Sequence, residues 1–325
     1  MQKRNKYFSF VIFAICLLLS ACVHKHKNSE VINKDAKYVT LSTNSSKVDL
    51  RSIFSFYDKD GKFLESNRFD DLILSNAIEF KDNIYYYGSK GIIKIDRNKN
   101  TIKKILDTSS DNIDEEEGIL YYNVNEDFVE SSKFDNKSKI CKFEEKECVS
   151  FNKMIHGFKV LKNNLYIILD SLQSDDETYT LRVYDFNTKK ILNEYNVPKG
   201  TDLQKADNKI YVIESGKPAY EYGNKENILS NDEYINNLFF NKNNKLIMEK
   251  YKHENGNSFL SLYNFTDKKE VVKISDGDGM YYTPYSDTVI SMDTANNKFT
   301  DLSNNKTIEL KQFNNYKTFN ALPLE

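Results

Sequence analysis

Residues Asp82–Leu106 have the sequence Asp-Asn-Ile-Tyr-Tyr-Tyr-Gly-Ser-Lys-Gly-Ile-Ile-Lys-Ile-Asp-Arg-Asn-Lys-Asn-Thr-Ile-Lys-Lys-Ile-Leu, and this stretch decides the fold. It contains three short runs rich in β-branched and aromatic residues, Ile84–Tyr87, Gly91–Ile95 and Thr101–Leu106. Gly, Ser, Asp and Asn separate the runs, so the pattern predicts three antiparallel strands joined by tight turns. Three such strands cannot bury their own apolar face, and we expect neighbours of the same kind.

Similar runs recur along the 325-residue chain at intervals of 36 to 45 residues. They begin near Val39, Ile84, Leu120, Leu165, Ile210, Leu246 and Val289. No segment shows the sustained apolar period of a helix. A repeat of this length made of strands alone is typical of a β-propeller. We therefore predict an all-β fold, a seven-bladed β-propeller with four-stranded antiparallel blades.

The later strands of the repeat end in a polar turn. The sequence Ile93-Lys94-Ile95-Asp96 has close counterparts at 183–185 and 262–264, looser ones at 56–58 and 133–135, and degenerate ones at 222–224 and 301–303. In the looser copy at 133–135, the next strand is expected at Lys139-Ile140. These motifs resemble the blades of bacterial PQQ-like and YVTN-like propellers. The chain has no Trp, which is common in PQQ-type blades, so we do not infer a quinone cofactor from this resemblance.

The segment before each repeat start is expected to supply a fourth, innermost strand. Leu74–Phe80 is the clearest case, and Thr318–Leu324 at the end of the chain resembles it. We therefore predict that the C-terminus supplies the innermost strand of the first blade, which closes the ring and removes a free edge. The alternative is that Glu30–Lys37 fills this position.

The first residues are typical of an export signal. Lys3, Arg4 and Lys6 precede the apolar run Phe8–Leu19, which is short for a membrane span. The following Leu-Ser-Ala-Cys, which ends at Cys22, resembles the bacterial lipobox, in which the Cys is acylated, for example with palmitate, and becomes the mature N-terminus. The alternatives are a plain secretory signal or an uncleaved anchor. The expected organisation is a signal peptide at 1–21, Cys22 with a flexible tether at 22–37, and the propeller at 38–325.

Composition and charge limit the classes of binding partner that we expect. The formal net charge is −2, and no basic block is present. A mildly acidic surface argues against nucleic acid as a partner. The expected partners are a membrane, reached through the N-terminal lipid of an exported bacterial lipoprotein, and a protein or another component of the cell envelope.

Two further cysteines, Cys141 and Cys148, flank six residues. A two-residue turn at Glu144-Glu145 would place them directly opposite each other on paired strands, at a distance that a disulfide bridges. Export would expose them to an oxidising compartment. We predict a cross-strand disulfide; the alternative is two unpaired thiols.

The sequence contains no recognised catalytic motif. Outside the tether, which holds His24 and His26, the histidines are His156 and His253, and they fall at different phases of the repeat. They are therefore expected to be ordinary strand or turn residues, and neither catalytic residues nor a multi-histidine metal site are predicted. Enzymatic activity stays open, with a non-enzyme favoured.

Three acidic segments are candidates for ligand binding, of which Asp58–Gly61 is expected to be a plain hairpin turn. Ser275–Gly279 contains Asp276 and Asp278, which could offer oxygen ligands to a structural Ca²⁺. The alternative is a glycine-rich turn between blades, and no cofactor is the main expectation. Asp111–Glu117 is expected to be a solvated loop between blades.

Tyrosines gather at Tyr85–Tyr87, at Tyr121-Tyr122, at Tyr220 with Tyr222, and at Tyr281-Tyr282 with Tyr285. Tyr281, Tyr282 and Tyr285 lie beside the Asp276–Asp278 loop and form the expected exposed aromatic rim. Such rims serve protein or glycan binding. The alternative is packing between blades.

These observations favour a lipid-anchored, non-catalytic propeller that serves as a binding platform. The alternatives are an envelope enzyme, such as a metal-dependent hydrolase or lyase, and a receptor for a glycan or small molecule at the channel mouth. A metal ion in the channel would favour the enzyme. An apolar and aromatic patch, with side chains filling the channel, would favour the platform.

Overall fold

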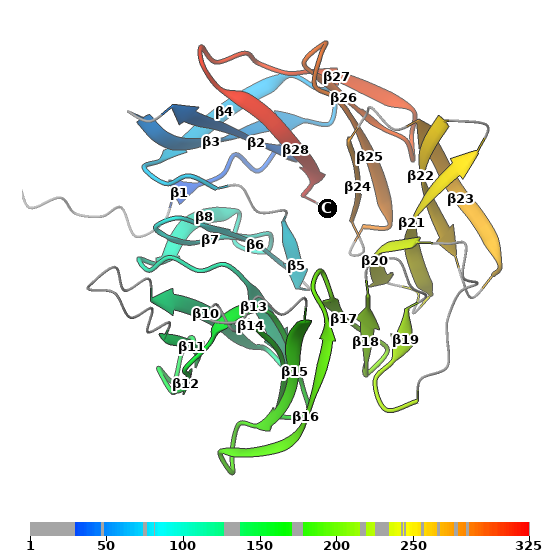
Figure 1. Cartoon of the computed structure of the whole chain (residues 1–325). Helices are drawn as coiled ribbons and strands as arrows, with labels where there is room; N and C mark the ends of the chain where they lie inside the picture. Colours follow the sequence, from blue (N-terminus) through cyan, green and yellow to red (C-terminus); the bar gives the residue numbers. More distant parts are fainter. Residues whose placement is uncertain are drawn as a thin grey trace, which may run out of the picture.

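The computed structural model places seven antiparallel sheets around a central axis, which makes the chain a seven-bladed β-propeller (Figure 1). The structure describes residues 30–46, 49–73, 77–80, 82–126, 137–170, 178–214, 219–224, 234–241, 243, 245–254, 257–264, 267–275, 279–283 and 286–324. Within these ranges every regular element is a strand, and no helix is long and apolar enough to cross a membrane. The predicted fold class is confirmed.

The first three blades contain the N-terminal half of the chain. Blade 1 consists of β28 (Lys317–Pro323), β2 (Ala36–Ser46), β3 (Asp49–Asp58) and β4 (Phe63–Phe69). Blade 2 consists of β5 (Ile78–Phe80), β6 (Asn83–Gly88), β7 (Gly91–Asp96) and β8 (Thr101–Leu106), with β1 (Glu30–Val31) added outside β8. Blade 3 consists of β9 (Ile113–Glu116), β10 (Ile119–Glu126), β11 (Lys137–Lys142) and β12 (Cys148–Phe151).

The other four blades follow in chain order. Blade 4 consists of β13 (Met154–Leu161), β14 (Asn164–Asp170), β15 (Thr178–Asp185) and β16 (Lys190–Pro198). The described strands of blade 5 are β17 (Asp202–Ala206), β18 (Lys209–Ile213) and β19 (Tyr220–Glu221). Blade 6 consists of β20 (Tyr234–Phe240), β21 (Leu246–Glu254), β22 (Asn257–Asn264) and β23 (Lys269–Ser275). Blade 7 consists of β24 (Gly279–Thr283), β25 (Thr288–Asp293), β26 (Lys298–Asp301) and β27 (Lys306–Glu309).

The polar turns of the repeat have two forms. Between inner and second strands, pairs such as Lys162-Asn163 and Asp207-Asn208 both have positive φ, as the type I′ hairpin requires. Between third and fourth strands, the Asp that ends the third strand accepts a backbone N–H from its own turn. Asp96 accepts one from Lys99 at 3.0 Å. The same Asx turn occurs at the ends of the third strands of blades 1, 4, 6 and 7, formed by Asp58, Asp185, Asn264 and Asp301.

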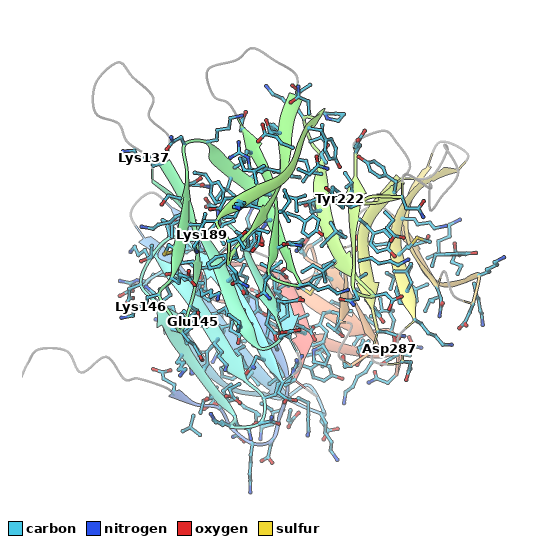
Figure 2. The ribbon with its side chains drawn as sticks, turned by 90° about the horizontal axis from the view of Figure 1, so that it is seen from below. Lys137, Glu145, Lys146, Lys189, Tyr222 and Asp287 are labelled. Atoms are coloured by element: carbon cyan, nitrogen blue, oxygen red, sulfur yellow. A yellow bond between two sulfur atoms is a disulfide. The ribbon has the colours of Figure 1, made fainter. Side chains whose placement is uncertain are left out.

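Both kinds of turn lie at one end of the strands, on a surface that we name the turn face. Glu145 and Asp287 belong to turns on this face and lie toward the bottom of Figure 2. Lys137, at the opposite end of a third strand, lies toward the top. The connections from one blade to the next leave from the other face, because each outer strand ends there.

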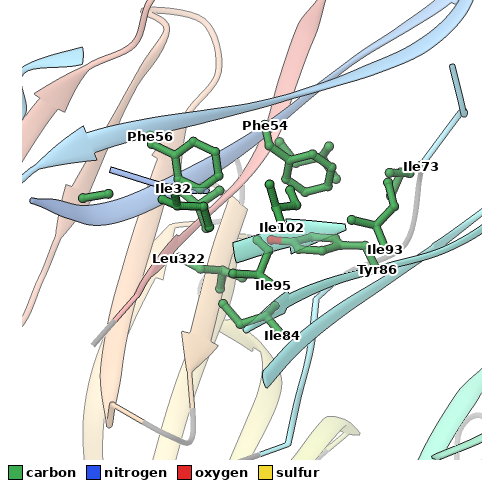
Figure 3. Close-up of a cluster of buried hydrophobic side chains, with 13 residues drawn as sticks. Ile32, Phe54, Phe56, Ile73, Ile84, Tyr86, Ile93, Ile95, Ile102 and Leu322 are labelled. Atoms are coloured by element: carbon green, nitrogen blue, oxygen red, sulfur yellow. The ribbon is translucent and has the colours of Figure 1, made fainter. Parts of the chain in front are cut away.

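The core consists of a hydrophobic cluster of described residues at each of the seven seams between neighbouring blades. The cluster between blades 1 and 2 is shown in Figure 3, where Phe54 packs edge-on against Tyr86 with ring centroids 5.0 Å apart. Ile93, Ile95 and Ile102 of the opening stretch are fully buried in it. Each sheet thus buries its apolar side chains against its neighbours, as the isolated meander could not.

The C-terminal strand closes the ring. β28 pairs with β2, with Leu322 opposite Val39 and Ala321 opposite Thr40. The last strand thus becomes the inner strand of the first blade, as predicted. Glu30–Lys37 does not take this position: Glu30 and Val31 pair with the outer edge of β8, and Ile32 is buried. The described end of the segment predicted as a flexible tether is therefore packed on the propeller.

Two details of the predicted repeat need correction. The third strand of blade 3 is β11, which contains Ile140, so the expectation that Ile140 begins the fourth strand is wrong. The copy at 133–135 and the start of the predicted inner strand, 74–76, lie outside the described residues; Ile78–Phe80 does form the inner strand of blade 2.

Candidate functional site

Four tyrosines form a partly buried aromatic group on the outer part of the seam between blades 4 and 5, which we name the tyrosine cluster. Its members are Tyr166 on β14, Tyr195 on β16, Tyr220 on β19 and Tyr222 just after β19. Tyr222 is labelled in Figure 2. The Tyr222 ring lies edge-on to Tyr166 at 5.1 Å between centroids and is stacked on Tyr195 at 6.3 Å. The cluster borders the buried core of this seam and is itself half-buried.

The cluster lies beside an unusually open strand. Eight residues of β16 point to solvent or are only partly covered, and only Val197 is buried. Ile191 and Leu192 are each 54% exposed, which makes them two of the most exposed large apolar side chains of the described residues. β16 pairs with β15 on one side, so its other edge carries backbone groups without a strand partner among the described residues.

Polar groups hold the tyrosine rings in place. Tyr220 donates its hydroxyl proton to the buried carboxylate of Glu214 at 2.9 Å, and Asn193 donates to the Tyr222 hydroxyl at 2.9 Å. Burial raises the pKa of Tyr195 to about 12, and burial together with the Glu214 hydrogen bond raises the pKa of Tyr220. The Tyr195 and Tyr220 hydroxyls therefore stay neutral at ordinary pH, and the cluster offers ring surface with polar edges.

The aromatic rim predicted near the Asp276–Asp278 loop is not formed as expected. Tyr282 on β24 is only 8% exposed; it packs in the seam between blades 6 and 7, and its hydroxyl donates to Asp287 at 2.6 Å. Tyr282 therefore follows the alternative, packing between blades, because β24 is an inner strand and this side chain packs against blade 6. Asp276, Asp278, Tyr285 and the side chain of Tyr281 lie outside the described residues, so the Ca²⁺ hypothesis stays a prediction.

Asp111–Glu117 is not a solvated loop. Residues 113–116 form β9, the inner strand of blade 3, and the Asp114 side chain is 4% exposed. Asp114 accepts the backbone N–H of Val160 at 2.7 Å. Its Oδ2 also lies 3.0 Å from Lys205 Nζ, which lies 3.1 Å from Glu116 Oε2. We name Asp114, Glu116 and Lys205 the channel cluster.

The channel cluster joins three blades, because Lys205 belongs to blade 5, Asp114 and Glu116 belong to blade 3, and Lys205 also bonds the carbonyl oxygen of Val160 in blade 4. Each carboxylate is thus already engaged by protein groups. A second paired charge lies in the inner region of blade 2, where Arg97 and Glu79 are 3.0 Å apart and both side chains are 5% exposed. Lys205 thus links three blades, and Arg97, in the β7–β8 turn, also donates a hydrogen bond to the carbonyl oxygen of Pro323 in blade 1 at 3.3 Å.

His156 is placed on β13 with its Nε2 3.1 Å from Asp170 and its ring stacked on Tyr179 at 4.4 Å. No Ser or Cys of the described residues forms a hydrogen bond with this ring, so a Ser-His or Cys-His pair is not assembled there. His253 is on β21, and its side chain lies outside the described set. Within the described ranges, no group of three or more His, Cys, Asp or Glu is arranged to hold a metal ion.

Cys141 and Cys148 are opposite each other on β11 and β12, and the structure joins them in a disulfide with Cα atoms 4.0 Å apart. The connecting turn is longer than the two-residue turn considered from sequence: Lys146 has a φ of 55° and donates its N–H to the Lys142 carbonyl. The bond joins the two outermost strands of blade 3. The proposed lipidation site, Cys22, lies outside the described residues.

Comparisons with known proteins agree with the fold. No family model matches the sequence, and no curated protein matches it. The structure is similar to the acylaminoacyl peptidase of Pyrococcus horikoshii, with 12% identity and a TM-score of 0.54 over 89% of this chain and 53% of that one. It is also similar to a quinonprotein alcohol dehydrogenase-like protein of Bacteroides thetaiotaomicron, with 16% identity and a TM-score of 0.41 over 79% of this chain and 67% of that one.

At these identities the similarity shows the β-propeller fold alone. The chain spans about half the length of the peptidase. Neither relative therefore supplies a substrate or a partner for this protein.

Proposed function

We propose that this protein is a lipid-anchored, non-catalytic binding platform of the bacterial cell envelope, and that it holds a protein partner along β16 and the tyrosine cluster. The observation that carries this proposal is the coincidence of an open edge strand, two exposed aliphatic side chains and a group of half-buried tyrosines on blades 4 and 5. Half-exposed tyrosines in a fixed arrangement are typical of protein-binding surfaces.

The geometry favours an extended segment of the partner. An extended peptide can add a strand to a free edge, where backbone hydrogen bonds supply affinity and alternate side chains supply specificity. β16 has nine residues, whereas β12 and β27, which are also outer strands, have four each. A bound strand would place apolar side chains over Leu192 and the rings of Tyr195 and Tyr222.

A photocrosslinking experiment in the native cell tests the platform. A photoreactive phenylalanine replaces Leu192, and as a matched control it replaces Val271, which is 49% exposed on β23, the outer strand of blade 6. The expected result is a discrete crosslinked protein from position 192 that is absent from position 271. The same product should weaken when Tyr222 is replaced by Ala. Equal products at both positions, or none at 192, would contradict the proposal.

The anchor rests on the sequence Leu19-Ser20-Ala21-Cys22 after a basic and apolar leader. Acyl chains on Cys22 would hold the protein on a membrane, at about 0.8 kcal/mol for each buried CH₂. Cys22→Ala should move the protein from the membrane fraction to the soluble fraction, whereas Cys16→Ala, within the leader, should not. A Cys22→Ala variant that stays with membranes after a carbonate wash would refute lipid anchoring.

A further inference from the structure

A cavity of about 730 Å³ opens on the turn face between blade 7 and blade 1. It lies at the seam where β28 closes the ring, on the other side of the propeller from the tyrosine cluster (Figure 1). Its walls come from the start of β2, from the β3–β4, β24–β25 and β26–β27 turns, and from Pro323 at the end of β28. This volume lies within the range of about 300–1,000 Å³ that is usual for small-molecule sites.

The floor of the cavity is a rigid polar cluster. Asp301 is 4% exposed and accepts hydrogen bonds from Tyr38 Oη at 3.0 Å, from Asn304 Nδ2 at 3.0 Å and from the Ser303 backbone N–H at 2.9 Å. The carboxylate is therefore fully engaged by the protein. It fixes the β26–β27 turn, so that the neighbouring amide groups are held in place before any ligand arrives.

The rim of the cavity is basic. Lys37, Lys59 and Lys306 line it, with Asp301 as the single acidic side chain of the lining. Lys306 Nζ bonds the Lys59 carbonyl oxygen and lies 3.5 Å from Asp60. The Lys59 ammonium is exposed and forms no ion pair among the described residues. In a chain with a net charge of −2, this concentration of positive charge is local and favours an anion.

The remaining lining offers hydroxyl and amide groups. Asn305, with a φ of 57°, has a side-chain amide that forms no hydrogen bond with any described residue. Asn304 and Ser303 lie beside it, and the Pro323 ring supplies an apolar wall. Ammonium groups suit a phosphate or carboxylate, amide and hydroxyl groups suit sugar hydroxyls, and an apolar wall suits the face of a sugar ring.

We propose that this cavity binds an acidic saccharide, a sugar that carries a phosphate or carboxylate group. The proposal does not depend on the protein partner of β16, because the two surfaces lie on different blades. Lys59 contributes charge to the ligand, and Asn305 contributes a hydrogen-bonding amide.

Isothermal titration of the purified protein with glucose 6-phosphate, glucuronate and glucose tests the proposal. The two anionic sugars should bind, with affinity that falls at high salt, and glucose should bind at least about tenfold more weakly. Inorganic phosphate serves as a further probe, and it should bind more weakly than glucose 6-phosphate because it lacks the hydroxyl groups.

Two variants locate the site. Lys59→Gln should weaken binding of glucose 6-phosphate about tenfold, and Asn305→Asp should weaken it further because it adds a negative charge to the lining. The matched controls are Lys199→Gln and Asn208→Asp, since Lys199 is an exposed loop lysine and Asn208 is a turn residue with a φ of 57° in blade 5. All four variants should melt like the parent protein.

Glucose that binds as tightly as glucose 6-phosphate, or an Asn305→Asp variant with unchanged affinity, would overturn the proposal. So would a lack of binding by both anionic sugars. None of these outcomes changes the result expected for crosslinking at position 192. The saccharide proposal can therefore fail while the proposed binding platform stands, and the reverse is also true.

Discussion

Ring closure by β28 can be tested by replacing Leu322 with Ala. Leu322 is 3% exposed and packs in the cluster between blades 1 and 2, opposite Val39. Removing a buried leucine side chain and leaving a cavity costs 2–5 kcal/mol, and we expect about 3 kcal/mol here. Chemical denaturation, followed by far-UV circular dichroism, measures this difference in the free energy of unfolding.

The location of the strands that lose protection from hydrogen exchange distinguishes a defect in ring closure from a general loss of core packing. Leu262→Ala is the matched control, because Leu262 is fully buried in the seam between blades 6 and 7, away from the closing strand. Both variants should lose similar free energy. Only Leu322→Ala should accelerate hydrogen exchange selectively in β2 and β28, since these strands join the two ends of the chain.

A loss below about 1 kcal/mol in Leu322→Ala would refute the assigned packing, since it falls outside the range for buried leucines. Unchanged exchange in β2 would refute the closure argument even if the free energy fell. Deleting residues 317–325 is the stronger perturbation, and it should abolish a single cooperative melting transition, because it removes the whole β2–β28 ladder.

Three further predictions concern the disulfide, the channel cluster and the tyrosines. Replacing Cys141 and Cys148 by Ser should lower stability by about 2.4 kcal/mol, as expected for the short loop that the bond closes, and adding reductant to the double variant should then have no effect on its melting temperature. Lys205→Met should cost about 3 kcal/mol, because it leaves the buried Asp114 carboxylate without its ion pair, and adding Asp114→Asn should recover part of the loss in denaturant titrations. Burial raises the pKa of Tyr195 to about 12 in the folded protein, whereas the unfolded side chain ionises near pH 10. The stabilisation that its neutral hydroxyl gives is therefore complete below pH 10 and is lost as the pH rises to 12. Tyr195→Phe should reduce the fall in the free energy of unfolding over this pH range.

Each of these three has an outcome that contradicts it. A reducing agent that leaves the parent protein's melting temperature unchanged would count against a stabilising disulfide. A double variant at Lys205 and Asp114 that is no more stable than Lys205→Met would show that the two groups do not interact. A Tyr195→Phe curve parallel to the parent between pH 10 and pH 12 would show that this hydroxyl is not held neutral by burial.

The repeat could be predicted from sequence because its signals are local. Each predicted repeat start falls in a second strand, at β2, β6, β10, β14, β18, β21 and β25. Alternating apolar residues specify the strands, and Asp or Asn residues specify the turns, as Asp96 and Asp185 do by accepting backbone N–H groups of their own turns. Such contacts span only a few residues, so one copy is enough to recognise the others.

Burial of charged and aromatic residues could not be predicted in the same way, because it depends on neighbouring blades. The acidic residues around Asp114 predict a solvated loop, yet its partner Lys205 lies 91 residues further along the chain. The Gly and Asp residues near Tyr282 predict an exposed rim, yet this side chain faces blade 6 from an inner strand. Nothing in the local sequence distinguishes an inner strand that faces another blade from a loop that faces water.

The two candidate sites both coincide with the copies that depart most from the repeat. The degenerate copy at 222–224 carries Tyr222 of the tyrosine cluster, and the one at 301–303 carries Asp301 at the floor of the cavity. A regular copy uses its side chains to pack against the next blade or to cap its own turn. The described part of blade 5 ends just after the two-residue β19, where Tyr222 stacks on Tyr195 of β16. In blade 7, Asp301 still caps its turn, but that turn now faces the closing strand across a cavity rather than across packed side chains. Departure from the repeat is therefore the sequence signal that best locates surface available for binding in this fold.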